Sequence, residues 1–155
     1  MALKVGDKAP NFKLYNSERE EVSLDGLQGH KVVLLFFPQA FTGVCTAEMC
    51  STRDDISFYQ NLDAQVFGIS VDSVFTLAKF KEDQKLNFPL LSDFNKETSR
   101  AYGSLDEEWL LGMKGVAKRS AFVIDKTGVI RYAEVLDNPK ELPNFEALKT
   151  TLASL

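Results

Sequence analysis

Two apolar runs mark the centre of the predicted sheet. Residues 32–37 (VVLLFF) and 66–71 (VFGISV) have almost no polar alternation, which is typical of strands covered on both faces. Shorter alternating patterns around residues 9–14 and 22–24 predict two half-buried strands near the start of the chain. From Cys45 to about Leu62 the apolar positions recur at helical spacing, so we expect one continuous helix there.

The second half of the chain predicts another helix, a hairpin and three smaller elements. Asp72 or Ser73 can cap a helix whose apolar positions lie within residues 74–80. Residues 121–124 and 129–132 are apolar runs joined by Asp-Lys-Thr-Gly, a pattern that predicts a hairpin. The smaller elements are a short apolar segment at 88–91, a brief helix ending at Gly103, and an amphipathic helix opening near Pro143.

The order of these elements predicts the fold class. A strand–helix–strand unit makes the first part of the sheet parallel, whereas the later hairpin requires antiparallel pairing. We therefore expect an α/β protein with the thioredoxin fold, in which helices flank a central mixed β-sheet and an N-terminal β-hairpin extends it. A flavodoxin-like, all-parallel sheet has no place for so short a hairpin. With no repeat or linker visible, we expect one domain over residues 1–155.

Composition and charge exclude several classes of function. The 155 residues are 45% hydrophobic, enough for a sizeable core, and carry a net charge of -4. That charge disfavours a nucleic acid or an acidic membrane surface as a partner. The longest wholly apolar run is far shorter than the roughly 20 residues that a membrane helix needs. Because the first residues lack a secretion signal as well, we expect a cytoplasmic protein.

The two cysteines indicate neither a disulfide scaffold nor a metal site. Cys45 and Cys50 are separated by four residues, and His30 is the sole histidine of the chain. A C-x4-C spacing differs from the usual zinc knuckle, and these three residues do not complete a tetrahedral site without carboxylates. No phosphate-binding glycine loop is present. We therefore expect neither a metal ion nor an organic cofactor.

The segment from Pro38 to Cys45 carries the strongest chemical signal. It leaves a buried strand and delivers Cys45 to the first turn of the predicted helix. Unpaired N–H groups and the helix dipole at such a turn stabilise a thiolate, which is the nucleophilic form of cysteine. On position alone, an inert cysteine buried in the core is a comparable explanation.

The same segment resembles the active-site pattern of peroxiredoxins, P-x3-[TS]-x2-C, as Pro38-x3-Thr42-x2-Cys45. The similarity extends along most of the chain, through Gly6-Asp7-x2-Pro10-x-Phe12 with Ala9 inside it, Phe88–Asp93, Ala101-Tyr102-Gly103, and Arg119-x2-Phe122–Asp125 with Gly128. Together these motifs are similar to peroxiredoxins of the alkyl hydroperoxide reductase E and bacterioferritin comigratory protein type. The resemblance implies a thiol peroxidase that reduces hydrogen peroxide and organic hydroperoxides through a sulfenic acid at Cys45.

The resemblance also implies roles for the residues around Cys45. Thr42 would bring its hydroxyl beside the sulfur and the peroxide, and the ring of Pro38 would shield the site from water. Arg119 would hold the thiolate with a fixed cation, and the backbone N–H groups of Val44 and Cys45 would complete the pocket. Simpler explanations stay open at this point: Thr42 as a helix cap, Pro38 as a strand terminator, and Arg119 as a surface charge.

Glu48 has two interpretations of equal weight. One helical turn after Cys45, it matches a residue that orients the arginine in related proteins. Alternatively, its carboxylate simply suits the positive end of the helix.

Cys50 lies at the position of the resolving cysteine in the bacterioferritin comigratory protein group, whereas relatives nearer alkyl hydroperoxide reductase E use an external thiol. Along an intact helix, five residues separate the two Cα atoms by roughly 8 to 9 Å. A disulfide requires less than about 7 Å. We therefore expect the start of the helix to unwind, giving a Cys45–Cys50 disulfide that thioredoxin or a similar dithiol protein reduces.

Some alternatives and one departure from the pattern remain. A thioredoxin-like disulfide oxidoreductase would favour C-x-x-C, and a redox-sensing interaction protein would not turn over. We expect the segment from Leu105 to Met113, including Trp109, to be a few residues longer than in close relatives, and its end is unusually apolar. It suits a pocket for organic hydroperoxides, a dimer interface, or a loop folded onto its own core. We expect a monomer or a homodimer.

Overall fold

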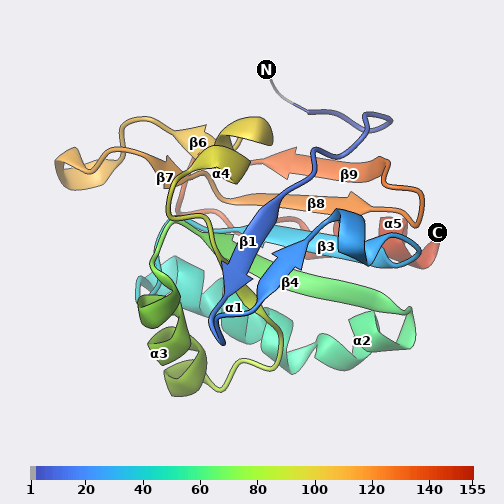
Figure 1. The fold of residues 1–155 in the computed structure, drawn as a ribbon, viewed down its shortest axis with the longest axis horizontal. Helices are drawn as coiled ribbons and strands as arrows, with labels where there is room; N and C mark the ends of the chain where they lie inside the picture. Colours follow the sequence, from blue (N-terminus) through green and yellow to red (C-terminus); the bar gives the residue numbers. More distant parts are fainter. Residues whose placement is uncertain (1–2) are drawn as a thin grey trace.

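The computed structural model describes residues 3–155 and contains a central sheet with helices around it (Figure 1). The strands are β1 (Lys13–Asn16), β2 (Glu21–Ser23), β3 (Lys31–Phe36), β4 (Ala64–Ser70), β5 (Leu90–Ser92), β6 (Leu105–Asp106), β7 (Val116–Ala117), β8 (Ser120–Ile124) and β9 (Ile130–Val135). The helices are α1 (Gly43–Asp54), α2 (Ile56–Asn61), α3 (Val74–Gln84), α4 (Glu97–Ala101) and α5 (Phe145–Ala153), with short 3-10 turns η1 (Asp25–Leu27) and η2 (Leu110–Gly112).

The main sheet is mixed, as the order of elements predicted. Its seven strands are arranged β2-β1-β5-β4-β3-β8-β9. Strands β3, β4 and β5 run parallel, whereas β8 pairs antiparallel with both β3 and β9. The N-terminal hairpin β1–β2 joins the opposite edge through antiparallel pairing of β1 with β5. The all-parallel, flavodoxin-like alternative is therefore wrong, because the hairpin β8–β9 belongs to the same sheet.

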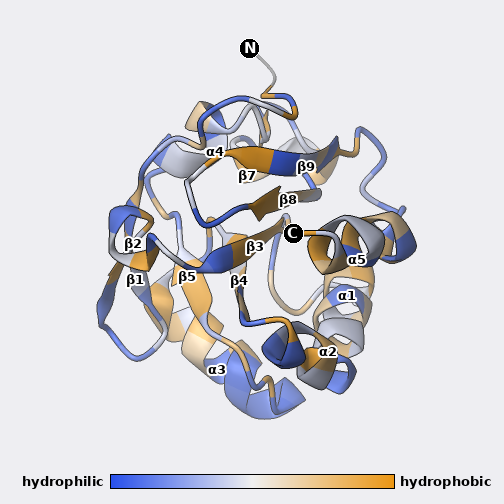
Figure 2. Cartoon of the chain, turned by 90° about the vertical axis from the view of Figure 1, so that its right-hand side faces the viewer, coloured by the Kyte–Doolittle hydropathy of each residue, from blue (hydrophilic) through white to orange (hydrophobic). Residues whose placement is uncertain are grey.

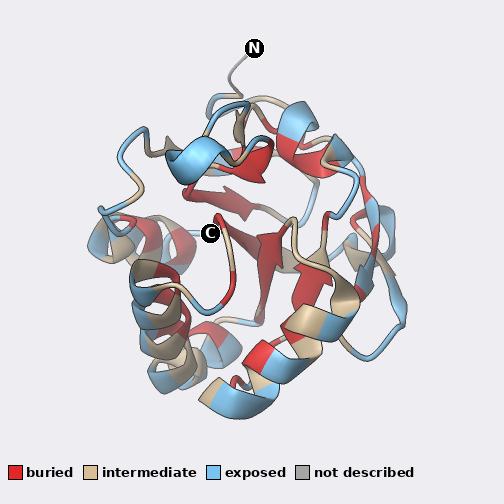
Figure 3. Cartoon of the chain, turned by 90° about the vertical axis from the view of Figure 1, so that its left-hand side faces the viewer, coloured by how far each residue is buried: buried red, intermediate tan, exposed pale blue. Residues whose placement is uncertain are grey.

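The sheet is covered on both faces, which explains its unbroken apolar strands. Alternate side chains of β3 enter two separate cores: Val33 and Leu35 contribute to one, and Val32 and Leu34 to the other. Helices α1, α2, α3 and α5 pack on the first face, while the N-terminal segment and Tyr102, after α4, cover the second. Figure 2 shows α1, α2 and α5 together on one side of the strands, and Figure 3 shows buried strands at the centre of the molecule.

The long helix predicted from Cys45 to Leu62 is wrong, because it is interrupted. Helix α1 ends at Asp54, Asp55 has non-helical backbone angles (φ -109°, ψ 11°), and α2 begins at Ile56. The carboxylate of Asp55 pairs with Lys149 of α5. Aspartate favours helix ends over interiors because its short polar side chain competes for backbone hydrogen bonds. The apolar periodicity continues across the break, so the sequence pattern concealed it.

The other predicted helices are present with small shifts. Of the two candidate caps for α3, Ser73 is the one that accepts a hydrogen bond from the backbone N–H of Thr76. Helix α5 starts two residues after Pro143, with Asn144 as its cap. Across residues 3–155, no helix is both long and apolar enough to span a bilayer.

Candidate active site

The register of the sheet brings two distant parts of the chain together. Because β3 and β8 are antiparallel neighbours, Ser120 lies opposite Phe36, the last residue of β3. Arg119, one residue earlier, therefore lies at the end of β3 from which the chain continues toward α1. The cysteine in the first turn of α1 and the arginine before β8 meet at this point.

Cys45 lies in a buried site beside a positive charge. Its side chain is 1% exposed, and it occupies the first turn of α1. Arg119 donates a hydrogen bond from Nη2 to the sulfur over 3.3 Å. A fixed cation at this distance, together with the N-terminus of a helix, stabilises a negative charge on the sulfur.

Arg119 is buried and fully engaged, so its interpretation as a surface charge is wrong. Only 2% of its side chain is exposed. Besides the sulfur, it donates to Oε1 of Glu48 over 2.6 Å, and from Nε and Nη2 to the carbonyl oxygen of Pro139 over 3.3 and 3.0 Å. Burial lowers the pKa of Arg119, but Glu48 and Cys45 raise that pKa by more, so the guanidinium keeps its charge.

Glu48 is the buried carboxylic acid of α1. Its Oε1 pairs with Arg119, while its Oε2 has no hydrogen-bond partner within residues 3–155. Burial raises the pKa of Glu48 to about 7; Arg119 opposes this shift, and the nearby Glu134 adds to it. The ion pair favours the interpretation in which Glu48 orients the arginine over the one in which it only suits the helix end.

A tyrosine that sequence reasoning missed lies in the same buried region. The hydroxyl of Tyr59, from α2, is buried with no hydrogen-bond partner in the described part of the chain. Burial, and to a smaller extent the charge of Glu48, raises the pKa of Tyr59 to about 12. Tyr59 therefore stays neutral at physiological pH, close enough to Glu48 for that charge to contribute to the shift. In the sequence it appears only as an apolar position of the predicted helix.

Thr42 and Pro38 lie in the loop that connects β3 to Cys45. Thr42 occupies the N-cap position of α1, but its side chain forms no cap hydrogen bond in the structure as described. The hydroxyl instead donates to the carbonyl oxygen of Gln39 over 2.8 Å. Thr42 is therefore at the N-cap position, as the helix-cap interpretation expects, but without the side-chain hydrogen bond of a cap. Pro38 follows Phe37 directly after β3 and is buried, as a shielding role requires.

Cys50 has surroundings unlike those of Cys45. It is half-buried and forms a contact of 3.4 Å between its sulfur and Oε1 of Gln84, the last residue of α3. Arg53 lies beside this contact and donates to the carbonyl oxygen of Gln84 over 2.6 Å. Both cysteines are free thiols on the intact helix α1. The structure thus agrees with the expectation that the helix separates them.

The segment around Trp109 forms a projecting hairpin. Strands β6 and β7 pair at its base, and η2 lies at its end. Leu110 is 50% exposed and Leu111 91% exposed. For these two leucines, the interpretation as a loop folded onto its own core is wrong. A pocket wall and a dimer contact remain predictions for the segment.

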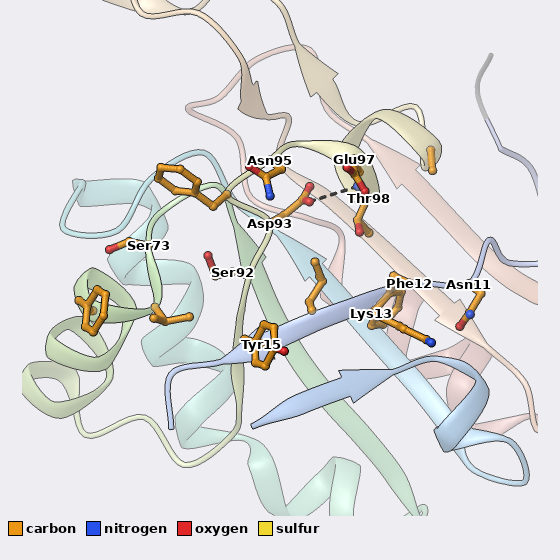
Figure 4. Close-up of a pocket in the computed structure, with 15 residues that line it drawn as sticks. Asn11, Phe12, Lys13, Tyr15, Ser73, Ser92, Asp93, Asn95, Glu97 and Thr98 are labelled. Atoms are coloured by element: carbon orange, nitrogen blue, oxygen red, sulfur yellow. Dashed lines mark hydrogen bonds between the residues drawn. The ribbon is translucent and has the colours of Figure 1, made fainter. Parts of the chain in front are cut away.

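A cavity of about 810 Å³ lies elsewhere on the molecule (Figure 4). Its walls come from β1, the start of α3 and the segment from Ser92 to Ala101, with Tyr15, Phe75 and Phe94 among the lining side chains. Cys45, Thr42 and Arg119 are not among the described residues that line it. The cavity is therefore separate from the thiol chemistry described above.

Comparisons with known proteins agree on one family. Residues 5–133 match the model described as the AhpC/TSA family. Alkyl hydroperoxide reductase E of Mycobacterium bovis is 38% identical over 156 residues, covering 99% of this chain and 98% of the relative. A putative bcp peroxiredoxin of Coxiella burnetii is 42% identical over 132 residues, covering 84% of this chain and 87% of the relative.

Solved structures lead to the same fold. The crystal structure of peroxidoxin BcpB from Mycobacterium tuberculosis superposes with a TM-score of 0.87 at 30% identity, covering 99% of this chain and 98% of that one. The predicted thioredoxin fold with a central mixed sheet is thereby confirmed.

Proposed function

Since the chain belongs to the AhpC/TSA family and is a thiol peroxidase, we propose that Cys45 is the residue that attacks the hydroperoxide. One observation carries this assignment: a buried sulfur at a helix N-terminus lies 3.3 Å from a guanidinium nitrogen of Arg119. This arrangement favours the thiolate. The thiolate is the form that attacks one oxygen of the hydroperoxide and breaks the O–O bond. Cys50 lacks such a direct contact with a guanidinium among the hydrogen bonds of residues 3–155, so it is the weaker candidate.

The proposed reaction is a displacement at one oxygen of the hydroperoxide. The Cys45 thiolate forms an S–O bond while the O–O bond breaks, and the leaving oxygen takes the electron pair. Protonation of that oxygen yields water from hydrogen peroxide or an alcohol from an organic hydroperoxide. Cys45 is oxidised to sulfenic acid, and the peroxide is reduced by two electrons.

Each neighbouring group has a role in this displacement. Arg119 stabilises the thiolate and the negative charge that grows on the leaving oxygen. The N–H groups of Val44 and Cys45, at the start of α1, add donors around the reacting atoms, and Thr42 contributes its hydroxyl. Buried Pro38 excludes water beside the sulfur. Glu48 is a positioning residue, because its 2.6 Å ion pair fixes the direction of the Arg119 fork.

Cys50 is the proposed resolving residue. Its thiolate attacks the Cys45 sulfenic acid, forms the disulfide and releases water, provided that the first turn of α1 unwinds. Two observations support this step. Cys50 is partly exposed, and its sulfur would lose a single side-chain hydrogen bond, to Gln84, when it moves. The intact helix between the two sulfurs favours a second mode of recycling, in which an external thiol resolves Cys45 directly.

The substrates are a hydroperoxide and a reducing thiol, as for the family. We propose that the reductant is thioredoxin or a similar dithiol protein, and that the enzyme works in the reducing cytoplasm as a monomer or homodimer. We also propose a single peroxiredoxin domain over residues 1–155, since both apolar cores share one sheet.

The test of these assignments compares three proteins: wild type, Cys45→Ser and Cys50→Ser. Peroxide-dependent oxidation of thioredoxin is measured for each, and the product of one equivalent of peroxide is identified by mass spectrometry. We expect wild type to form the Cys45–Cys50 disulfide and to turn over, and both variants to lose thioredoxin-dependent turnover. Turnover retained by Cys50→Ser would instead support resolution by an external thiol.

A further inference from the structure

The loop between β3 and α1 is held by an aspartate from a different part of the sheet. The backbone N–H of Ala40 donates to Oδ2 of Asp72 over 2.8 Å. On the other side of the same loop, the hydroxyl of Thr42 donates to the carbonyl oxygen of Gln39 over 2.8 Å. Phe41, between them, has a left-handed backbone (φ 67°). A non-glycine residue holds that conformation only where its surroundings impose it.

These two hydrogen bonds meet on a single peptide group. The carbonyl of Gln39 and the N–H of Ala40 belong to the same planar unit, because one amide bond joins the two residues. Asp72 therefore holds one edge of this plane, and Thr42 binds the opposite edge. A negative acceptor on the N–H also polarises the amide and makes its carbonyl a stronger acceptor.

Asp72 is itself fixed by neighbouring strands. It follows β4, and its Oδ2 accepts a second hydrogen bond from the hydroxyl of Ser70 over 2.7 Å. Its carbonyl oxygen accepts from the hydroxyl of Ser92, at the end of β5, over 2.6 Å. The cap of α3 is supplied by Ser73, so the Asp72 carboxylate is not used at the helix start.

We propose that Asp72 is a positioning residue for peroxide reduction: through the peptide group joining Gln39 to Ala40, its carboxylate fixes the direction in which Thr42 presents its hydroxyl. A hydroxyl has one proton and two lone pairs. Because the proton is donated to Gln39, only lone pairs are left for an incoming hydroperoxide. Thr42 thus accepts the O–H of the peroxide and aligns its O–O bond with the Cys45 sulfur.

This inference rests on the proposed function of Cys45. A positioning role for Asp72 and a purely structural role predict different effects on the reaction rates of Cys45. A structural anchor would affect every reaction of Cys45 equally. A residue that orients Thr42 toward a peroxide affects displacement on oxygen and leaves alkylation of the sulfur unchanged, because alkylation does not use the Thr42 hydroxyl.

The experiment uses the full chain in a Cys50→Ser background, so that Cys45 is the sole thiol. Rate constants for hydrogen peroxide and for iodoacetamide are measured at one pH for Asp72→Ala, Asp72→Asn and Ser73→Ala. We expect Asp72→Ala to lower the peroxide rate about tenfold, as loss of one oriented hydrogen bond does, and the iodoacetamide rate by less than about twofold. Asp72→Asn keeps an acceptor oxygen and restores most of the peroxide rate. Ser73→Ala, the matched control, removes the adjacent helix cap and changes neither rate.

A double-mutant cycle with Thr42→Val completes the test. If Asp72 acts through Thr42, Asp72→Ala has no further effect on the peroxide rate once the hydroxyl is gone. An additive effect, or an equal fall of the peroxide and iodoacetamide rates, would overturn the inference. Should Asp72→Ala not fold, Asp72→Ser, whose hydroxyl is too short to reach Ala40, takes its place in both measurements.

The two proposals fail in different ways. A wild-type peroxide rate no faster than that of free cysteine overturns the proposed function, and this inference with it. A fast wild type accompanied by an equally fast Asp72→Ala overturns this inference alone.

Discussion

The two cysteines of α1 lie five residues apart on one helix, yet their surroundings differ. Cys45 is 1% exposed and contacts the guanidinium of Arg119, which itself is held by a buried carboxylate. Cys50 is half-buried and contacts a neutral amide, that of Gln84. Cys45 lies in the first turn of α1 and Cys50 near its middle, so the two sulfurs differ in helix position as well as in their partners. Arg119, from a distant part of the chain, supplies the positive charge beside Cys45.

The largest effect is expected from removing the first sulfur. We predict that Cys45→Ser abolishes peroxide consumption, because a serine hydroxyl is not ionised at neutral pH and is a poor nucleophile toward oxygen. Peroxide loss is followed with excess reductant. Substantial activity in this variant would show that Cys50 is an independent reactive thiol and would break the comparison between the two sites.

Arg119 is the next test, because it is the feature that separates the two surroundings. Arg119→Ala should lower the peroxide rate by about 10² to 10³, as loss of a fixed donor to developing charge does. Above pH 7, where Glu48 is ionised in the folded wild type, this substitution should also destabilise the fold by about 3 to 5 kcal/mol, since the buried carboxylate loses its partner. The measurements are stopped-flow oxidation and denaturant unfolding.

A second substitution separates these two consequences of losing Arg119. The double variant Arg119→Ala/Glu48→Gln removes the unpaired carboxylate and should recover most of the stability without recovering the rate. Recovery of both would mean that Arg119 acts only by holding the fold together.

Glu48, which lies near Cys45 on α1, predicts a pH dependence of the free energy of unfolding. Burial raises the pKa of Glu48 from 4.5 to about 7, so between these values the folded protein holds a proton that the unfolded chain has lost. Stability therefore falls as pH rises through this window, by about 3 kcal/mol in total. Glu48→Gln should lack this pH-dependent contribution to stability. The difference between its melting temperature and that of the wild type should therefore increase from pH 4.5 to pH 7. A constant difference across that range would contradict the shifted carboxyl.

The smallest effect is expected at the second sulfur. Cys50→Ser should change the first oxidation of Cys45 by less than about threefold, because Cys50 contacts Gln84 and not the reacting sulfur. The product should change completely, from a disulfide to a sulfenic acid or its overoxidised forms. Rapid mixing followed by mass spectrometry distinguishes these products. A large fall in the first oxidation rate would place Cys50 inside the Cys45 site.

The sequence predicted the parts of the molecule that local pattern determines. Residues 32–37 and 66–71 correspond to the two central parallel strands, and the hairpin at 121–132 correctly required a mixed sheet. The break at Asp55 was not visible, because it leaves the apolar periodicity of the two helices intact.

The features of the candidate site also fall into those that local sequence pattern predicts and those that depend on contacts between distant residues. The spacing of Pro38, Thr42 and Cys45 is local, so a motif identifies it. The ion pair between Glu48 and Arg119 was anticipated from resemblance alone, since the pattern of residues left it equal to a simple helix-end effect. The link from Asp72 to Ala40 was missed, because an aspartate before a helix looks like an ordinary cap, and its real partner is 32 residues away in sequence.

The antiparallel pairing of β3 with β8 has a consequence for the newly made chain. Cys45 and its arginine are 74 residues apart in sequence, and they meet only after the strand beginning at Ser120 has docked beside β3. Contacts of such long separation form late in folding. On the proposed assignment of Cys45, the arrangement that we expect to react with peroxide is therefore complete only when β8 has joined the central sheet.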